Sequence, residues 1–339
     1  MRVTSFILFA ALAAAQSDPL LSGLEAYHRG DYVSAERDLR QALQAGKDPR
    51  AATFLALTLA ATGRCDGAAA DLAKAFEAGE EDVRRLAGLG LVQCDLAQAR
   101  VDDAAAVVAK LRTQFPTDSD VLYEAARVYR RAWNDTIYQL YEKAPASFRV
   151  NQISGEILEI QGRFAEAAEE YRKAIAKSPD TLNLHFRLGR ALLMSSHEPA
   201  ALDAALKEFR AELALNPMDA VTYYQVAQVL LAAQKQQEAG ASLERALELN
   251  PNFPEALVAL GKVRLDEKKN DDAIGLLRRA VKLTPRNEAA HYNLMIAYRD
   301  AGRMGEALAE KAELDKLQKT PEGEFTEFLK KLGEKPPGK

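Results

Sequence analysis

The sequence predicts an all-α fold built from repeated pairs of helices. The stretch ALELNPNFPEALVALGKV at residues 246–263 is followed 34 residues later by AVKLTPRNEAAHYNLMIA at residues 280–297, with an alanine, a proline and a leucine at matching places. Hydrophobic residues make up 48% of the chain and aromatic residues only 7%, and alanine occurs in nearly every segment. Alanine has the highest helix propensity and lets helices approach closely. Both observations therefore favour many small helix-to-helix contacts.

The length alone would suggest about two or three globular domains, because the chain has 339 residues. A repeat array is an exception to that rule, since each repeat buries its apolar face only against its neighbours. We therefore expect one continuous array.

The first residues, MRVTSFILFAALAAAQ, contain one arginine, an apolar run over residues 6–12 and three alanines before Gln16. This pattern is typical of a secretory signal peptide over residues 1–15, with cleavage after Ala15. An uncleaved amphipathic helix is the alternative interpretation. No later apolar run is long enough to span a bilayer. The sequence thus predicts a periplasmic or secreted protein without a membrane span.

Each 34-residue repeat is expected to hold two helices. The first carries large apolar residues at repeat positions 4, 7 and 11 and a small one at position 8; the second carries alanine at 20 and 27, a bulky residue at 24 and proline at 32. Small residues permit close approach, bulky ones fill the space between helices, and proline ends the second helix. The repeat from Pro254 shows this with Leu260, Gly261, Leu277 and Pro285.

This pattern resembles the tetratricopeptide repeat (TPR), here of the secreted or periplasmic bacterial type. The resemblance implies a right-handed superhelical α-solenoid of about nine repeats over residues 16–316. The expected repeats are 16–48, 49–82, 85–118, 119–147, 148–181, 182–219, 220–253, 254–287 and 288–316.

Three places depart from the pattern. Segment 119–147 lacks the glycine turn and the alanine pair, so whether it is a true repeat stays open. Segment 182–219 has 38 residues, and the four additional ones are expected between its helices, in MSSHEPAALD, either as a neutral insertion or as a loop for a partner. After the last repeat, Phe325 and Leu332 belong to a run of helical apolar spacing that predicts a capping helix over 320–332 and a disordered tail over 333–339.

The two cysteines, Cys65 and Cys94, lie in neighbouring repeats. In the resembled fold the helices that carry them pack antiparallel, which brings these two positions together. In an oxidising compartment a disulfide would tie the two repeats. Two reduced cysteines in the core are the alternative.

No motif for a catalytic, metal or cofactor site occurs: H-E-x-x-H, G-x-x-x-x-G-K-[ST], G-x-S-x-G and G-x-G-x-x-G are all absent. The four histidines are scattered, and the formal net charge of −4 comes without a dense Lys/Arg stripe, so nucleic acid is not an expected partner. A helical toroid glycosidase would also show helix pairs, but it would not need a strict 34-residue period. We therefore expect no enzyme, cofactor, metal or small-molecule substrate.

The resemblance also implies that first helices line a concave groove that holds a peptide, with repeat positions 2, 5, 9 and 12 pointing inward. Aromatic rings at position 5 beside Arg, Gln or Lys at position 9 suit a peptide, because rings supply contact area and polar tips meet backbone groups. The carboxylate clamp known in the family is not matched. The expected groove residues are Tyr123, Arg127, Arg130, Gln152, Glu156, Phe186, Arg190, Tyr224, Gln228, Lys262 and Tyr292.

The sequence therefore predicts a non-catalytic scaffold or adaptor of the bacterial cell envelope that binds a protein or peptide segment in this groove. The alternative is an accessory, non-catalytic subunit of an envelope enzyme or of a polysaccharide or cell-wall assembly complex.

Overall fold

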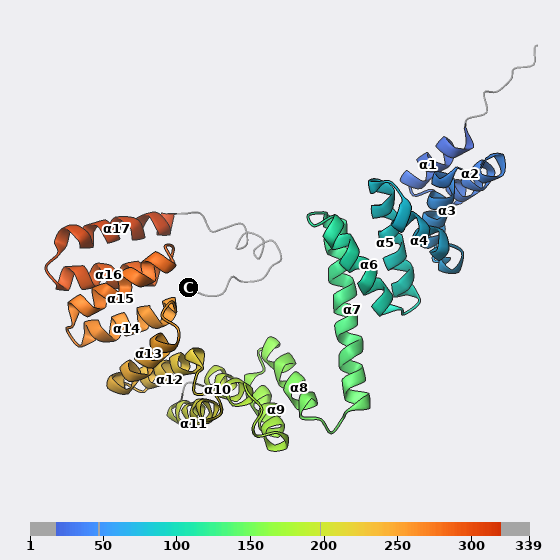
Figure 1. Cartoon of the computed structure of the whole chain (residues 1–339). Coiled ribbons are helices and arrows are strands. Elements are labelled where there is room, and N and C mark those ends of the chain that lie inside the picture. The colour runs from blue at the N-terminus through green and yellow to red at the C-terminus, as the bar shows by residue number, and fades with distance from the viewer. Residues whose placement is uncertain (1–17, 47, 197, 320–339) are drawn as a thin grey trace, which may run out of the picture. The chain divides into compact units, whose positions relative to one another are not determined.

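The computed structural model describes residues 18–46, 48–196 and 198–319. These residues form α-helices joined by short turns, and no strand occurs among them, which confirms the prediction of an all-α solenoid of helix pairs (Figure 1). The predicted signal peptide, capping helix and tail lie outside the described residues. The chain divides into an N-terminal unit, Met1–Lys143, and a C-terminal unit, Ala144–Lys339.

The N-terminal unit contains three helix pairs and one long helix. Two of the expected repeats differ from the structure. In segment 119–147, which the sequence left open as a repeat, Ser119–Lys143 form one continuous helix of 25 residues and not a helix pair. The missing glycine does not by itself explain this, because Ala99, Gln234 and Lys268 adopt positive φ at turns between other paired helices. The first helix of the repeat expected at 85–118 begins earlier, at Glu81, where two acidic residues in the first turn favour a helix start. The elements are α1 Pro19–His28, α2 Tyr32–Ala45, α3 Pro49–Ala61, the short 3-10 helix η1 Cys65–Gly67, α4 Ala69–Ala78, α5 Glu81–Ala97, α6 Val101–Gln114 and α7 Ser119–Lys143.

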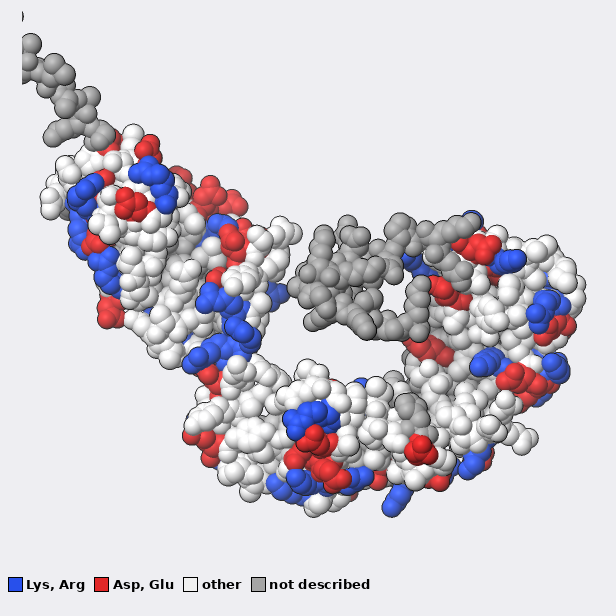
Figure 2. All heavy atoms as spheres, turned by 180° about the vertical axis from the view of Figure 1, so that it is seen from behind, with Lys and Arg blue, Asp and Glu red and all other residues white. Residues whose placement is uncertain are grey.

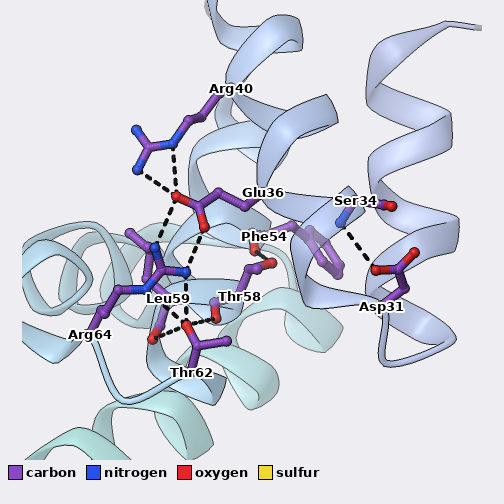
Figure 3. Close-up of polar contacts among 9 residues, drawn as sticks. All are labelled: Asp31, Ser34, Glu36, Arg40, Phe54, Thr58, Leu59, Thr62 and Arg64. Carbon is purple, nitrogen blue, oxygen red and sulfur yellow. Dashed lines mark hydrogen bonds and ion pairs between the residues drawn. The ribbon is translucent and has the colours of Figure 1, made fainter.

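Aspartates cap α1, α2 and α3, the three helices at the start of this unit. Asp18, Asp31 and Asp48 each accept a hydrogen bond from a backbone N–H in the first turn of the following helix. A carboxylate at this position satisfies a donor that the helix leaves free and interacts favourably with the helix dipole. The bond from Ser34 N to Asp31 Oδ1 is 3.1 Å long (Figure 3), and such bonds to Ser34 hold the pKa of Asp31 below its usual value.

A hydrogen-bond network ties α2 to the end of α3 (Figure 3). Glu36 accepts from Arg40 Nε at 3.0 Å and from Arg64 at 3.1 and 2.6 Å. Arg64 also donates to the Thr62 hydroxyl, which in turn donates to the carbonyl of Thr58 at 2.9 Å. The hydrogen bonds from Arg64 and then from Arg40 lower the pKa of Glu36. The network thus fixes the turn that precedes Cys65.

Cys65 and Cys94 form a disulfide in the structure, with Cα atoms 5.3 Å apart. Both residues are buried in the core of the N-terminal unit. The bond joins η1 to α5, and it therefore links the second helix pair to the third.

Asp95 stands where the repeat pattern has a large apolar residue, and the structure shows how it is accommodated. Its side chain is buried, and Oδ1 accepts from Arg100 Nε at 3.1 Å and from Arg100 Nη2 at 2.6 Å. A buried carboxylate is tolerated when it is paired and hydrogen-bonded in this way.

The C-terminal unit contains five helix pairs in its described residues. The four additional residues of segment 182–219 do not form a projecting loop. They lie mostly in α11, which has 17 residues where the second helices of the flanking pairs have 14, and Pro199 begins it. The helices are α8 Phe148–Ile160, α9 Phe164–Lys177, α10 Leu184–Ser195, α11 Pro199–Leu215, α12 Ala220–Ala232, α13 Gln236–Leu249, α14 Pro254–Asp266, α15 Asn270–Leu283, α16 Glu288–Asp300 and α17 Met304–Lys319.

Glycine at repeat position 8 allows close packing in this unit. A Cβ added to Gly155 would lie 2.7 Å from Cε1 of Tyr171, and one added to Gly189 would lie 2.7 Å from Cε1 of Phe209. Both rings belong to fully buried side chains. Since burial is complete, the pKa of Tyr171 is raised, first through loss of solvation. The ring of each second helix thus occupies the space that glycine leaves on the first.

In the described part of the chain, no helix is both long and apolar enough to cross a membrane.

Candidate functional site

A pocket of about 470 Å³ lies between the first helices α8 and α10 of the C-terminal unit. This volume is within the range of about 300–1,000 Å³ that is usual for small-ligand pockets in proteins. Three of the expected groove residues line it. The lining residues are Arg149, Gln152, Thr181, Leu182, Asn183, Phe186, Arg187 and Arg190.

The wall formed by the start of α10 depends on a buried carboxylate. Asn183 has a left-handed backbone conformation, with φ of 70°, which asparagine tolerates better than most residues. Its N–H donates to Glu212 Oε1 at 2.7 Å, and the N–H of Phe186 donates to Glu212 Oε2 at 3.3 Å. Glu212 is 1% exposed, so it satisfies free donors at the helix start away from water. It thereby fixes the segment that carries Phe186.

The floor of the pocket is held by a chain of polar contacts across α8 and α10. Arg187 is paired with Glu156 at 3.1 Å and with Glu159 at 3.6 Å. Gln152 Nε2 donates to Glu156 Oε1 at 3.1 Å, and Gln152 Oε1 accepts from Arg149 at 2.6 Å. The positive charge of Arg187 is therefore neutralised, while Gln152 and Glu156 hold their neighbours in position.

Two other guanidinium groups at the pocket carry uncompensated charge. Arg149 donates to the amide oxygen of Gln152 and stacks on the ring of Phe148, with 4.5 Å between its Cζ and the ring centroid. Arg190 is exposed and has no ion pair with any residue that the structure describes. No acidic residue lines the pocket itself. The lining therefore holds two guanidinium groups without an ion pair among the described residues, and no carboxylate.

Phe186 supplies the apolar surface of the pocket. It is half-buried, and its ring lies 5.8 Å from the ring of Phe209, measured between centroids. A ring held by a buried neighbour loses little conformational entropy on binding.

The other expected groove residues are divided between the two units. Tyr123, Arg127 and Arg130 lie on α7 of the N-terminal unit and are exposed; Arg127 pairs with Glu124 at 2.8 Å. The remaining five lie in the C-terminal unit and do not line the pocket: Glu156 on α8, and Tyr224, Gln228, Lys262 and Tyr292 on later first helices.

Tyr224 and Tyr292 differ in environment. The ring of Tyr224 packs on Phe253 with centroids 5.1 Å apart, and burial raises its pKa. Tyr292 is 51% exposed. Tyr224 therefore has a packing role, and Tyr292 is free to meet a partner.

Sequence reasoning missed several residues of the site, among them Arg149, Glu212 and Arg187, and signals for the first two were present. Arg149 stands at repeat position 2, which the rule for inward positions includes. Glu212 replaces the alanine found at position 27 in repeats such as that of Ala246, and this departure was a usable signal. Arg187 follows Phe186 directly and falls outside the inward positions, so only the structure reveals it.

Other cavities have different characters. One of about 480 Å³ lies in the N-terminal unit against α3, α4 and the start of α5. Its lining mixes small and aliphatic side chains with charged ones of both signs, contains no aromatic ring, and its arginine, Arg50, is paired with Asp48 at 2.9 Å. Figure 2 shows acidic and basic side chains interspersed with broad uncharged areas on the face that it draws. A free cationic group beside an aromatic ring therefore singles out the pocket between α8 and α10.

The described histidines have structural surroundings. His185 Nδ1 lies 2.6 Å from Glu208, and the buried His291 contacts Glu310 at 2.6 Å and the carbonyl of Pro285 at 3.0 Å. Within the described ranges, no group of three His, Cys, Asp or Glu residues could hold a metal ion.

Comparison with known families identifies the repeats. Residues 20–83, 155–195 and 220–253 match family models of the tetratricopeptide repeat, so the chain contains such repeats in both units. Residues 245–320 match a model described as a bacterial transcriptional activator domain. The transcriptional role in that description belongs to the proteins of that family. No curated protein matches the chain.

Several solved structures are similar to parts of the chain. A crystal structure of MamA protein is 19% identical with a TM-score of 0.46, covering 56% of this chain and 98% of that one. MamA 41-end from Desulfovibrio magneticus RS-1 is 18% identical with a TM-score of 0.48, covering 52% and 97%. YrrB, described as a TPR protein with an unusual peptide-binding site, is 19% identical with a TM-score of 0.46, covering 57% and 97%. Similarity at this level says nothing of what this chain binds.

Proposed function

We propose that this protein is a non-catalytic scaffold of the bacterial cell envelope that holds a segment of a partner protein at the pocket between α8 and α10. The observation that carries the proposal is the convergence of Arg149 and Arg190, two guanidinium groups without an ion pair among the described residues, with the ring of Phe186 on one cavity. Repeats of this type are in general protein-binding units, which supports the class of function.

The chemistry of the pocket indicates what such a segment carries. A carboxylate, from an aspartate, a glutamate or a chain end, forms paired hydrogen bonds with a guanidinium group. An apolar side chain next to it covers Phe186, while the polar groups of Gln152 and Asn183 are placed to meet the backbone of the segment. Arg187 contributes little attraction because Glu156 and Glu159 already neutralise it.

Selection of peptides on the purified chain tests this proposal. A phage-displayed library of random peptides should yield binders with an acidic residue beside an apolar one. The double variant Phe186→Ala/Arg190→Ala should bind them at least about tenfold more weakly, because it removes both the ring and the free charge. Arg210→Ala is the matched control, since Arg210 is an exposed arginine of α11 outside the pocket.

One result would contradict the pocket: selected peptides that bind the double variant as tightly as the unchanged chain bind somewhere else. If circular dichroism shows that the double variant has an altered helix content, the single variant Arg190→Ala, whose side chain is exposed, replaces it, and unchanged binding to that variant would contradict the role of Arg190.

The envelope location rests on the predicted signal peptide and needs its own test. Fractionation of the source cells, followed by sequencing of the mature N-terminus, should give Gln16 as first residue in the periplasmic or secreted fraction. A protein that retains Met1 in the cytoplasm would contradict the location and leave the binding pocket untouched.

A further inference from the structure

The last helix of the N-terminal unit, α7, has no second helix to pair with. In the eight helix pairs of the described chain, a second helix follows the first after a short turn. α7 instead continues for 25 residues to Lys143, where the N-terminal unit ends. In Figure 1 it extends past the other helices of its unit.

The C-terminal part of α7 is not buried. The buried residues of the helix end at Val128, and none of the residues 129–143 is buried. Several large side chains are instead exposed, among them Tyr129 at 42%, Trp133 at 49% and Tyr138 at 64%. Exposed aromatic surface of this extent marks an interaction site in soluble proteins.

One side of the helix carries a stripe of apolar side chains that are exposed over residues 122–133 and half-buried at Ile137 and Leu140, while the exposed Tyr138 lies outside it. Successive members are three or four residues apart, which places them on the same side of a helix and is the pattern of helix-to-helix seams. The buried residues Val121, Ala125 and Val128 lie about a third of a turn away at roughly 100° per residue, and they already serve the core of the unit. We call this second face the α7 stripe; it consists of Leu122, Ala126, Tyr129, Trp133, Ile137 and Leu140.

The edges of the α7 stripe are positively charged. Arg130 and Lys143 border it on the helix itself, and Arg130 has no ion pair with any described residue. Arg112 of α6 lies beside Tyr129, with its Nη1 3.4 Å from the hydroxyl and its Cζ 5.8 Å from the ring centroid.

The acidic residues of α7 lie elsewhere. Glu124, Asp135 and Glu142 fall on the opposite side of the helix at roughly 100° per residue. Glu124 is paired with Arg127 and Asp135 with Arg131. The α7 stripe is thus bordered by cations, and Glu124, Asp135 and Glu142 do not lie next to it.

We propose that the α7 stripe is the docking site for an acidic amphipathic helix of a partner protein, which takes the place of the missing second helix. A helix fits better than an extended strand, because the stripe has helical spacing and runs for about 27 Å at 1.5 Å per residue. Acidic flanks complement Arg112, Arg130 and Lys143. A second copy of this chain would bring the same cations to the same edges, with no carboxylate to meet them.

This surface is separate from the pocket between α8 and α10, and the proposal does not depend on that site. Trp133 is the one tryptophan in the sequence, so its fluorescence reports on the stripe alone. The probe is a synthetic peptide of three heptads with leucine at the two seam positions and glutamate at the flanking positions. A second peptide carries lysine in place of each glutamate.

Binding of the acidic peptide to the full chain should shift Trp133 emission to shorter wavelength and reduce its quenching by acrylamide. The lysine peptide should bind at least about tenfold more weakly at low salt, because its charges repel those at the stripe edges. Arg130→Glu should reverse this preference. Arg131→Glu is the matched control, since Arg131 is the neighbouring residue on the opposite side of the helix and should leave binding unchanged.

Ile137→Glu should abolish binding of the acidic peptide, and it lies in the part of α7 without buried residues, so the fold should persist by circular dichroism. Three results would overturn the proposal. If Trp133 is already shielded from acrylamide in the free chain, the chain itself covers the stripe. If its emission changes with protein concentration alone, a second copy is the occupant. If both peptides bind equally, charge does not select the partner.

Discussion

The N-terminal and C-terminal units are built from the same kind of helix pair, but the N-terminal unit carries a covalent link in addition. The C-terminal unit relies on close packing, in which Tyr171 and Phe209 fill the space left by Gly155 and Gly189. The N-terminal unit uses the same close packing, with Gly23 against Leu39 and Gly88 against Leu111. It adds a disulfide and the ion pair of the buried Asp95 with Arg100. The disulfide and the polar pair therefore supplement the packing of this unit and do not replace it.

The largest expected effect is the loss of a packed ring in the C-terminal unit. Phe209→Ala should lower the free energy of unfolding of this unit by about 3–5 kcal/mol, because Phe209 is fully buried and leaves a cavity against Gly189. Urea unfolding followed by circular dichroism measures the change. Gly275→Ala is the control: an added Cβ there has no atom within 4 Å, so it should be neutral or slightly stabilising. A loss below about 1 kcal/mol for Phe209→Ala would contradict the packing account.

The second effect concerns the disulfide of the N-terminal unit. Cys65→Ser/Cys94→Ser should cost this unit about 2–4 kcal/mol, since the bond closes a segment with a sequence separation of 29 residues. Hydrogen exchange should show lower protection over α3 to α6 and unchanged protection over α8 to α17. Alkylation of the unreduced mature protein provides the direct check. If both thiols react without a reductant, the N-terminal unit lacks its covalent link.

The third effect tests whether the ion pair replaces apolar packing. Arg100→Ala should cost about 1–3 kcal/mol, because it leaves Asp95 buried without its partner. The double variant Asp95→Leu/Arg100→Ala should recover most of this loss, since a large apolar residue is usual at that repeat position. A double-mutant cycle in urea separates the two contributions. Additive losses would mean that the two side chains act independently.

The smallest effect is a pH dependence in the N-terminal unit. Arg64 and Arg40 hold the pKa of Glu36 below its usual value, so the stabilisation is present above about pH 4.3 and is lost as pH falls through the lowered pKa. Compared with Glu36→Gln, the unchanged chain should lose roughly 0.5 kcal/mol between about pH 5 and pH 3. Urea midpoints of both proteins across this range give the difference. Parallel curves would show that the network in Figure 3 contributes no pH-dependent stability.

Much of the fold was predictable because the repeat pattern is a pattern of packing. The recurring small residue at Gly155 and Gly189 and the bulky residue at Phe209 fix the helix pairs, and both can be read from the sequence. The sequence did not predict that α7 is one continuous helix, because the absence of a glycine does not reveal whether the chain turns at that point. The four additional residues of segment 182–219 were located correctly in the sequence but were expected in a turn. They extend α11 instead, and Pro199 is well suited to begin a helix.

The site was predictable only in part. The rule for inward positions gives Phe186 and Arg190 but cannot show which inward residues share a pocket. That depends on Glu212, which reaches from α11 to fix the start of α10, and on ion pairs that neutralise Arg187 and leave Arg190 free. Charge compensation is a property of contacts in space, so the sequence pattern does not contain it.

Hydrogen exchange of the whole chain, with and without a library-selected peptide, tests the central claim most directly. The pocket between α8 and α10 predicts added protection at residues 148–160 and 181–195, where the peptide would contact both first helices. The N-terminal unit should remain unchanged. Protection confined to α3, α4 and α5, around the cavity of about 480 Å³, would contradict the assignment of the binding site.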